Sequence, residues 1–339
     1  MNNFKKVGLS ALAGSLAMVS AQAVEYSVAG DAQVVYSSAQ GNENATEASN
    51  GKGIGVDTDL AFSASGELDN GWTVSINHVL NTDEAVTNSS TQMAIGMGSL
   101  GTLQFNDQLG NATNAIDDVL PFAYEEPWDG TTGTSEFNIF GSQLNEGSIT
   151  YTAPAIELMG ATITAKYDYD PQANVDAPSA GSVGTDGPSG QGATIAIAHE
   201  SGLTIGGGFT DVSNTDDVVG ESGYTGYLKY ANGPLTVAYQ EFYHNASIDS
   251  DAESPDSDGS GYAIAYTAGD MSFSYSVQNE QTNAISNTAA LEEEEMQAVQ
   301  AAYTMGAMTV AASLYESDNV EGVAAVKYEE TEISVSFAF

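Results

Sequence analysis

The alternation of apolar and polar residues limits what this chain can fold into more than any other feature. In "MSFSYSVQ", Met271, Phe273, Tyr275 and Val277 alternate with serines and a glutamine. The same two-residue period recurs in other segments, among them residues 24–37, 54–68, 72–80, 163–168 and 331–339. Side chains of a β-strand point alternately to opposite faces, so each segment is predicted to be a strand with one apolar and one polar face.

The connections between these segments fall into two length classes that alternate along the chain. Short joints rich in Gly and Asn, as tight hairpins require, occur at residues 68–71, 99–101, 157–160, 201–202, 232–234, 269–270 and 306–307. Long polar stretches occupy residues 39–52, 81–90, 110–146, 171–190, 213–221, 246–259 and 282–295. The pattern predicts about sixteen strands with short turns on one side and long, acidic loops on the other.

The asymmetry of the connections favours a transmembrane β-barrel over a soluble sandwich. A sandwich has no reason to place its tight turns at one end, and its inner faces need bulky residues. Here the polar faces carry mostly Ser, Thr, Gln, Asn and Asp, which suits a water-filled interior, while the apolar faces suit lipid. A closed barrel also satisfies every backbone hydrogen bond. We therefore predict an all-β, antiparallel transmembrane barrel over residues 24–339.

The N-terminus carries the pattern of a secretory signal peptide. Lys5 and Lys6 precede an apolar stretch over residues 7–19, and "AQA" at residues 21–23 offers a cleavage site. The apolar stretch is shorter than the roughly 20 residues that a membrane-spanning helix needs. Residues 1–23 are therefore predicted to be a signal peptide of an exported chain.

Charge excludes one class of partner. The chain has 6 Lys+Arg against 46 Asp+Glu, a net charge of −40, with no arginine and no cysteine. Such a chain is not expected to bind nucleic acid. Hydrophobic residues make up 42% of it, which is enough apolar surface to fold. The lack of cysteine removes any disulfide framework and leaves the redox compartment open.

Two acidic runs, at residues 249–259 and 291–295, suggest metal binding only superficially. In the first, Glu253 and Pro255 interrupt the alternating ligands of a calcium loop, and the second is a plain charge block. No cofactor and no defined metal site are predicted. Weak binding of Ca²⁺ or Mg²⁺ by the loops stays open, because so many negative charges need counterions.

The two ends of the chain and its third long connection carry a family resemblance. The signal peptide, "AVEYSVAGDAQVVY" as first strand, the connection at 110–146 and a last strand closing on Phe339 resemble the Gram-negative general porins, particularly the trimeric alphaproteobacterial kind. The resemblance implies an outer-membrane homotrimer surrounded by lipid, with a channel for passive diffusion of small hydrophilic solutes. It also implies that Phe339 belongs to the signal read by the outer-membrane assembly machinery.

The third long connection, residues 110–146, is too long for an ordinary hairpin loop and contains a dense apolar set. Its apolar residues are Ile116, Val119, Leu120, Phe122, Tyr124, Trp128, Phe137, Ile139 and Phe140. They predict a segment that folds inward and packs against a wall. In the porins the corresponding loop narrows the channel. By position, the resemblance assigns to this constriction Asp117, Asp118, Glu125, Glu126, Asp129 and Glu136, although some of these acids are expected to cap local turns.

Alternation also predicts which charges line the lumen wall, namely Asp31, Asp57, Asp59, Lys166, Asp168 and Lys229. General porins set a basic cluster across the constriction from the loop acids, but two lysines on different strands cannot rebuild one. We therefore expect a uniformly negative lumen that prefers cations. The alternative is a structural or adhesive surface barrel that displays acidic loops.

An enzyme is not expected, because the three histidines, His78, His199 and His244, form no constellation with a nucleophile or carboxylate. His78 falls on the apolar face of its strand.

In the last strand, the alternation at its end and the alternation at its start assign opposite faces to the same positions. Counting back from Phe339, odd positions such as Ile333 and Val335 face lipid, and an unbroken strand would put Lys327 there too. The residues upstream instead suggest Val326 and Tyr328 outward and Lys327 inward. The sequence therefore predicts a one-residue shift, a β-bulge, within residues 328–332.

Overall fold

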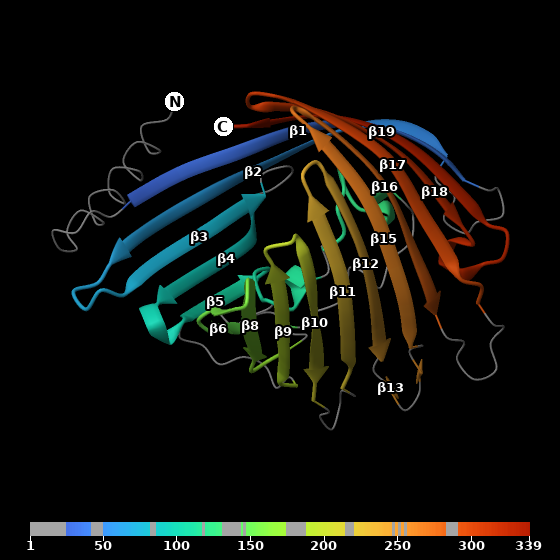
Figure 1. The fold of residues 1–339 in the computed structure, drawn as a ribbon. Coiled ribbons are helices and arrows are strands. Elements are labelled where there is room, and N and C mark those ends of the chain that lie inside the picture. Colours follow the sequence, from blue (N-terminus) through green and yellow to red (C-terminus); the bar gives the residue numbers. More distant parts are fainter. Residues whose placement is uncertain are drawn as a thin grey trace.

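The protein is an antiparallel β-barrel in a computed structural model (Figure 1). The structure describes residues 25–41, 50–81, 86–116, 119–130, 144, 147–173, 188–213, 220–245, 248–249, 252–253, 256–282 and 291–339. The predicted signal peptide lies outside these residues. No helix in the described ranges is long and apolar enough to cross a membrane.

The strands of the barrel follow the alternating segments of the sequence. They are β1 (Glu25–Gly41), β2 (Gly51–Glu67), β3 (Thr73–Asn81), β4 (Thr87–Gly96), β5 (Thr102–Gln108), β6 (Ile149–Thr152), β7 (Ile156–Leu158), β8 (Ala161–Asp170), β9 (Gly190–His199), β10 (Leu203–Val212), β11 (Ser222–Asn232), β12 (Leu235–Asn245), β15 (Ser257–Ala268), β16 (Met271–Thr282), β17 (Glu294–Met305), β18 (Met308–Asp318) and β19 (Lys327–Ala338). A separate hairpin, β13 (Ile248–Asp249) and β14 (Ala252–Glu253), follows β12. Short 3₁₀ turns are η1 (Gly98–Leu100), η2 (Asn114–Ile116), η3 (Pro127–Gly130) and η6 (Val320–Gly322).

The barrel has the predicted sixteen spans. Seventeen strands pair in one sheet, but β6 and β7 both pair with β8, so together they form one span interrupted around Pro154. Proline has no backbone N–H, which explains the interruption. The sheet closes because β19 pairs with β1. At the seam the Gly30 N–H donates to the Phe339 carbonyl at 2.6 Å, and the Phe339 N–H donates to the Gly30 carbonyl at 2.8 Å.

The two faces of the wall differ as the alternation predicts. Bulky residues on the outer face stay exposed to the surroundings of the barrel, for example Ile195, Leu228 and Val299. On the inner face of β16, Ser274 and Ser276 are buried. The apolar side chains therefore point away from the interior, as lipid outside requires.

Short turns connect the strands at one end of the barrel. Gly202 between β9 and β10 shows why glycine is needed there: its φ is +91°, and a Cβ at this position would lie 1.9 Å from the Ala231 carbonyl oxygen. Any L side chain would clash and would be strained at this φ. Phe339 lies at the same end, so the last strand finishes where the tight turns are.

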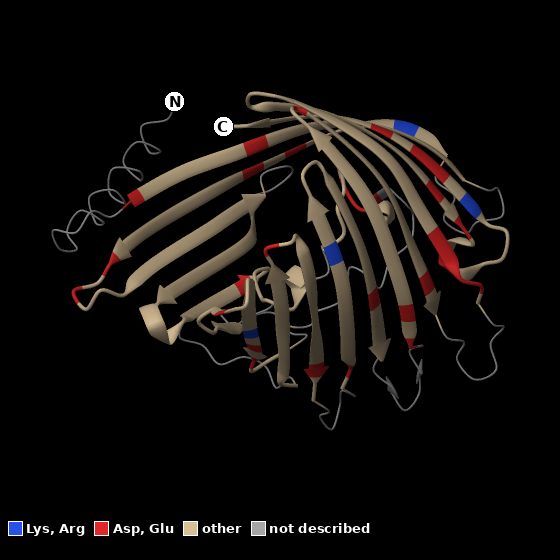
Figure 2. Cartoon of the chain, in the orientation of Figure 1, with Lys and Arg blue, Asp and Glu red and all other residues tan. Residues whose placement is uncertain are grey.

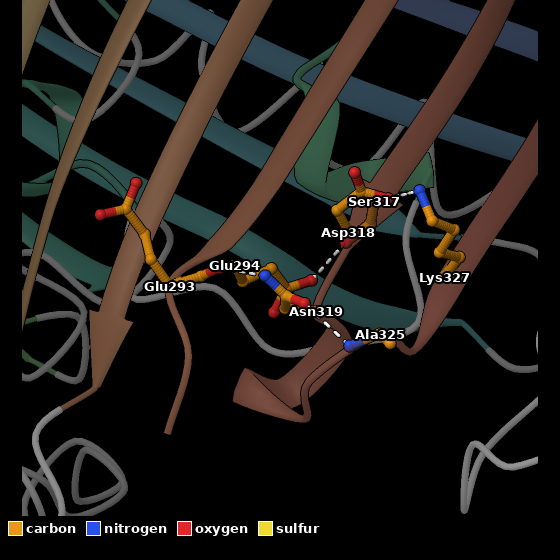
Figure 3. A network of polar contacts seen from close by, with 7 residues as sticks. All are labelled: Glu293, Glu294, Ser317, Asp318, Asn319, Ala325 and Lys327. Atoms are coloured by element: carbon orange, nitrogen blue, oxygen red, sulfur yellow. Dashed lines mark hydrogen bonds and ion pairs between the residues drawn. The ribbon is translucent and has the colours of Figure 1, made fainter. Parts of the chain in front are cut away.

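The predicted bulge in the last strand is wrong. The pairing of β18 with β19 runs without a shift from Asp318 opposite Lys327 to Met308 opposite Phe337. Lys327 therefore faces outward, and its Nζ lies 2.6 Å from Asp318 Oδ1, with both side chains exposed (Figure 3).

Two residues on either side of Lys327 explain the difference. Val326 and Tyr328 are apolar, which predicts that they face lipid, but they pack inward with Val320 and the partly buried Ala39. Lys327 stands at the first residue of β19, at the end opposite the turns, where an outward lysine costs only about 0 to 1 kcal/mol. An unbroken strand is therefore compatible with its charge.

Candidate functional site: the barrel interior

The described part of the third long connection lies inside the barrel (Figure 1). Two polar side chains on inward faces of the wall hold its backbone. Gln240 of β12 donates from Nε2 to the Ile116 carbonyl at 3.0 Å. Lys229 of β11 donates from Nζ to the Val119 carbonyl at 3.0 Å. Leu120 and Phe122 pack against Ala238 and Ala263 of the wall. The loop therefore crosses the interior in contact with β11, β12 and β15.

Asp168 of β8 anchors the start of this loop. The carboxylate accepts hydrogen bonds from the Ala112 N–H at 3.1 Å, the Thr113 N–H at 2.8 Å and the Thr150 hydroxyl at 2.5 Å. It is 0% exposed. Asp168 thus lies on the inner face, as alternation predicts, but the loop covers it. Its role is to position the loop rather than to present a charge to the lumen.

Glycines on the neighbouring strand leave room for the root of the loop. A Cβ at Gly192 of β9 would lie 2.5 Å from the Thr113 side chain, and one at Gly190 would lie 2.3 Å from the Leu144 side chain. Leu144 is fully buried with Ala173 and Val212. The sequence "GQG" therefore serves close packing of the loop against the wall.

The tip of the loop is fastened to the wall on the side of β16 to β19 and β1. The Ala123 N–H donates to the Ser274 hydroxyl at 2.9 Å, and the Tyr124 N–H donates to Gln300 Oε1 at 3.1 Å. The Gln33 side chain of β1 donates to the Tyr124 hydroxyl at 3.0 Å. These contacts join the loop to three separate strands, so they fix how far it reaches into the interior.

Glu125, at this tip, lies in surroundings that raise the pKa of its carboxyl group. Tyr315 of β18 donates its hydroxyl to Glu125 Oε1 at 2.6 Å. Burial, followed by a hydrogen bond to Glu332, raises the pKa of the Glu125 carboxyl to about 9. The Tyr315 hydrogen bond works in the opposite direction and is outweighed. Glu125 is therefore protonated at neutral pH and adds no full charge to the lumen.

The other two described loop acids differ from each other. Glu126 is 7% exposed and accepts a hydrogen bond from the Trp128 indole. Asp129 is exposed, and its carboxylate accepts from the Glu126 N–H at 3.0 Å, so it caps the short turn η3. The remaining predicted constriction acids, Asp117, Asp118 and Glu136, lie outside the described residues.

The wall acids predicted from alternation form a group on β1 and β2. Asp31 lies directly opposite Asp59, and Asp57 lies opposite Gln33, whose side chain reaches the loop. Asp31 is exposed, while Asp57 and Asp59 are half-buried. Asn81 of β3 donates to Asp57 at 3.4 Å. Three carboxylates thus share one inward face beside the loop tip.

Sequence reasoning missed two further carboxylates on the inner face of β19. Glu332 accepts a hydrogen bond from the Ser37 hydroxyl at 2.8 Å, and Glu330 accepts one from the Tyr328 hydroxyl at 2.6 Å. Both are half-buried. The signal was present, since unbroken alternation from Phe339 back to Lys327 puts both residues inward, but the expected bulge obscured it.

Beside the wall acids, toward the end of the barrel with the tight turns, is a cavity of about 840 Å³ against β1 to β5. Its lining is rich in uncharged hydroxyl and amide side chains, among them Ser27, Ser63, Ser75, Asn77, Gln92 and Gln104. Ser27 and Ser63 hydrogen-bond each other at 2.7 Å, and Asn77 donates to Gln92 at 3.2 Å. This open part of the interior is thus mostly polar, and the root of the loop borders it at Gly110.

The positive charges of the interior are sparse (Figure 2). One lysine lies on β8 and one on β11. Lys166 of β8 is exposed on the inner face, while Lys229 is bonded to the loop backbone. In the described ranges no three His, Cys, Asp or Glu side chains are placed to hold a metal ion. The interior can therefore conduct polar solutes past carboxylates, with one exposed lysine on the opposing wall.

A closed barrel with an apolar outside, a polar inside and a loop packed within it defines a membrane channel. Comparison with known proteins identifies the family. Residues 8–339 match the family model described as Gram-negative porin, and the chain belongs to this family. It is an outer-membrane channel for passive diffusion, and members of this family are not enzymes. No curated protein matches the sequence.

Solved structures share the fold at low sequence identity. The outer-membrane protein OmpT of Vibrio cholerae, in a form lacking loop L8, superposes with a TM-score of 0.66 at 12% identity, covering 94% of this chain and 100% of that one. A porin refined at 1.8 Å resolution gives 0.62 at 14% identity, with 93% and 100% covered. A mutant of the Rh. blastica porin gives 0.56 at 12% identity, with the same coverage. At such identities the likeness concerns the fold alone.

Proposed function

We propose that this porin is a homotrimeric channel that prefers cations and passes small hydrophilic solutes. The observation that carries the cation preference is the group formed by Asp31, Asp57 and Asp59 on one inward face beside an open polar cavity. Carboxylates inside low-dielectric walls focus a negative potential, which raises the local cation concentration.

The composition of the chain also supports a negative potential in the lumen. The chain has no arginine, and the half-buried Lys229 lies against the loop, where its Nζ donates to the Val119 carbonyl. Lys166 is the one described lysine exposed on the inner face. Two inward lysines, Lys166 and Lys229, stand against the three wall carboxylates and the further inward carboxylates Glu330 and Glu332, which supports a negative lumen. Weak Ca²⁺ or Mg²⁺ binding at the acidic loops would reduce repulsion there without forming a dedicated site.

The test is a reversal-potential measurement on the purified protein in planar bilayers under a salt gradient. We expect stepwise conductance and a potential whose sign corresponds to cation preference. The selectivity should weaken as salt rises, because the Debye length falls from about 10 Å at 0.1 M to about 3 Å at 1 M. Anion preference would refute the selectivity while leaving the channel intact. A sealed barrel would instead favour a role in surface display.

Two proposals concern biogenesis. Residues 1–23 act as a signal peptide cleaved after Ala23, and Phe339 acts as part of the assembly signal. The second is supported by the exposure of Phe339, 73% in the folded barrel, and by its place at the seam beside Gly30. Replacing Phe339 by alanine should lower the amount of barrel in the outer membrane, measured in membrane fractions, while a protein refolded in detergent should conduct normally.

A further inference from the structure

The cavity against β1 to β5 has a floor of side chains that lie in two rows across the strands. Cross-strand partners on the inward face form the first row, which consists of Ser27, Ser63, Asn77 and Gln92. The second row lies two residues closer to the short turns and consists of Glu25, Ser65, Ser75 and Gln104, with Ala94 between the last two. We call these two rows the polar floor. Neighbours in a row are about 4.5 to 5.5 Å apart between Cβ atoms, so one solute can reach several of them.

The root of the third long connection fixes the amide side chains of the polar floor. Gln92 Nε2 donates to the Leu109 carbonyl at 2.8 Å, and Gln104 Nε2 donates to the Gly110 carbonyl at 2.9 Å. Asn77 Nδ2 donates to Gln92 Oε1, which joins β3 to the same network. These bonds orient the side chains before any solute arrives. A site with ordered side chains loses less conformational entropy when it binds a solute.

Two hydroxyls of the polar floor are available to a solute. Ser65 and Ser75 lie opposite each other and are exposed, and neither hydroxyl forms a hydrogen bond with another residue that the structure describes. On the inner face of β16, by contrast, Ser276 and Gln278 are 0% exposed. A serine hydroxyl donates one hydrogen bond and accepts two. This pair therefore faces water that a solute can displace.

The chemistry of the polar floor fits a neutral solute that carries several hydroxyls. Among the described residues that line the cavity Glu25 is the one charged group, so no lysine there binds the carboxylate of an amino acid. Hydroxyls and amides both donate and accept, as the hydroxyls of a sugar require. Leu109, 46% exposed, offers an apolar contact for the C–H face of a sugar ring. The volume of about 840 Å³ lies within the range of about 300 to 1,000 Å³ that small-molecule sites occupy.

We infer that the polar floor is a weak, saturable binding site for a neutral polyhydroxylated solute of mono- or disaccharide size. The inference rests on the passage of small hydrophilic solutes proposed above and names a class of solute for it. A site inside a channel must release its solute as readily as it admits it. Each floor hydroxyl also gives up a water molecule when it binds a sugar, so each hydrogen bond adds little net affinity. The half-saturating concentration should therefore be on the order of 10 mM.

Ion-current recordings of the purified protein in planar bilayers test the site. Glucose or sucrose at increasing concentration should reduce the current along a saturating curve, after correction for the conductivity of the solution. The control solute is a polyethylene glycol of the same hydrodynamic size, because the ether oxygens of its chain accept hydrogen bonds but cannot donate them. The glycol should give a decrease that does not saturate. Equal curves for sugar and glycol would overturn the site, and so would a saturating block by free glycine without one by sugar.

Removal of the available hydroxyls gives an independent test. Ser65→Ala with Ser75→Ala should raise the half-saturating sugar concentration by about two- to tenfold, the factor that loss of one hydrogen bond gives. Ser65→Thr with Ser75→Thr keeps both hydroxyls and should raise that concentration by less than about twofold. The matched control is Thr267→Val with Ser272→Ala, an inward hydroxyl pair beside the short turn of β15 and β16 that lies outside the cavity. It should leave the concentration unchanged.

The outcomes separate the site from the proposed function. Heat-modified gel migration shows that each variant barrel is folded. A conducting channel without a saturable sugar block would refute the site and leave the channel intact, and so would a block that responds equally to the Ser65 and Ser75 variants and to the control pair. Anion preference would refute the proposed selectivity and leave the site standing. A sealed barrel would refute both the proposed passage of solutes and the site.

Discussion

The carboxylates of the third loop and those of the β1–β2 wall occupy the same interior but present different charges. Glu125 and Glu126 on the loop are covered and hydrogen-bonded, and burial keeps Glu125 protonated at neutral pH. Asp31 on the wall is exposed beside Asp57 and Asp59. A count of acids therefore overstates the field from the loop. What decides the field is which carboxylates keep their water and their charge.

The largest expected effect comes from removing the wall charges. Replacing Asp31, Asp57 and Asp59 together by asparagine should lower the cation-to-anion permeability ratio by roughly three- to tenfold, because the focused potential near the open cavity is lost. The matched control is Glu125→Gln with Glu126→Gln on the loop, which should change the ratio far less at pH 7. Reversal potentials at 0.1 M salt measure both. An equal or larger effect of the loop pair would reverse the comparison.

Detaching the loop from its anchor should have the next largest effect. Asp168→Ala leaves the Ala112 and Thr113 N–H groups without their acceptor, at a cost of about 1 to 3 kcal/mol for each buried group. We expect a folded barrel whose single-channel current becomes noisy, because the loop root is no longer fixed. Asp168→Asn keeps one acceptor oxygen, so its current noise should lie between that of the wild type and that of Asp168→Ala. A quiet current from Asp168→Ala would mean that Gln240 and Lys229 suffice to hold the loop.

Alkaline pH should ionise Glu125 and so add a negative charge to the loop. The folded-state pKa of Glu125 is raised to about 9 from an ordinary value of 4.5. The folded state thus binds the extra proton, and the stability this gives is complete below about pH 4.5 and lost as pH rises toward 9. Between pH 7 and 10 the ionised loop should increase cation preference and lower the unfolding temperature. Glu125→Gln should remove both trends, and persistence of either trend in that variant would assign the titration to another group.

Parity along the strands explains what the sequence could predict. Alternation predicts the inner face for Asp31, Asp57, Asp59 and Lys166, because a two-residue period leaves no choice of face once the neighbours are assigned. Unbroken alternation counted back from Phe339 also puts Glu330 and Glu332 on the inner face. The predicted bulge hides this, because it assumes that the apolar Val326 and Tyr328 face lipid, whereas they pack inward at the rim under the turn η6.

Burial of the loop could not be predicted from the same pattern. Nothing in the spacing of Glu125 shows that Tyr315, 190 residues away, donates to it. Likewise, alternation predicts that Asp168 presents its charge to the lumen. The strand position gives the face of Asp168 but does not show that the loop covers it. Long-range contacts of an irregular segment have no period, so only the folded structure distinguishes a carboxylate that faces water from one that binds backbone N–H groups.

The smallest expected effect concerns the one described lysine exposed on the inner face. Lys166 on β8 opposes the acids in sign, so Lys166→Gln should raise the cation-to-anion permeability ratio, by less than about twofold, because an exposed charge in water is strongly screened. The control is Lys229→Gln, whose larger consequence should be a less stable loop, since it removes the bond to the Val119 carbonyl. Reversal potentials at 0.05 M and 1 M salt separate the two, because a field effect fades at high salt and a displaced loop does not. A fall in cation preference on neutralising Lys166 would mean that the wall acids do not set the sign of the potential on the side of the lumen that ions use.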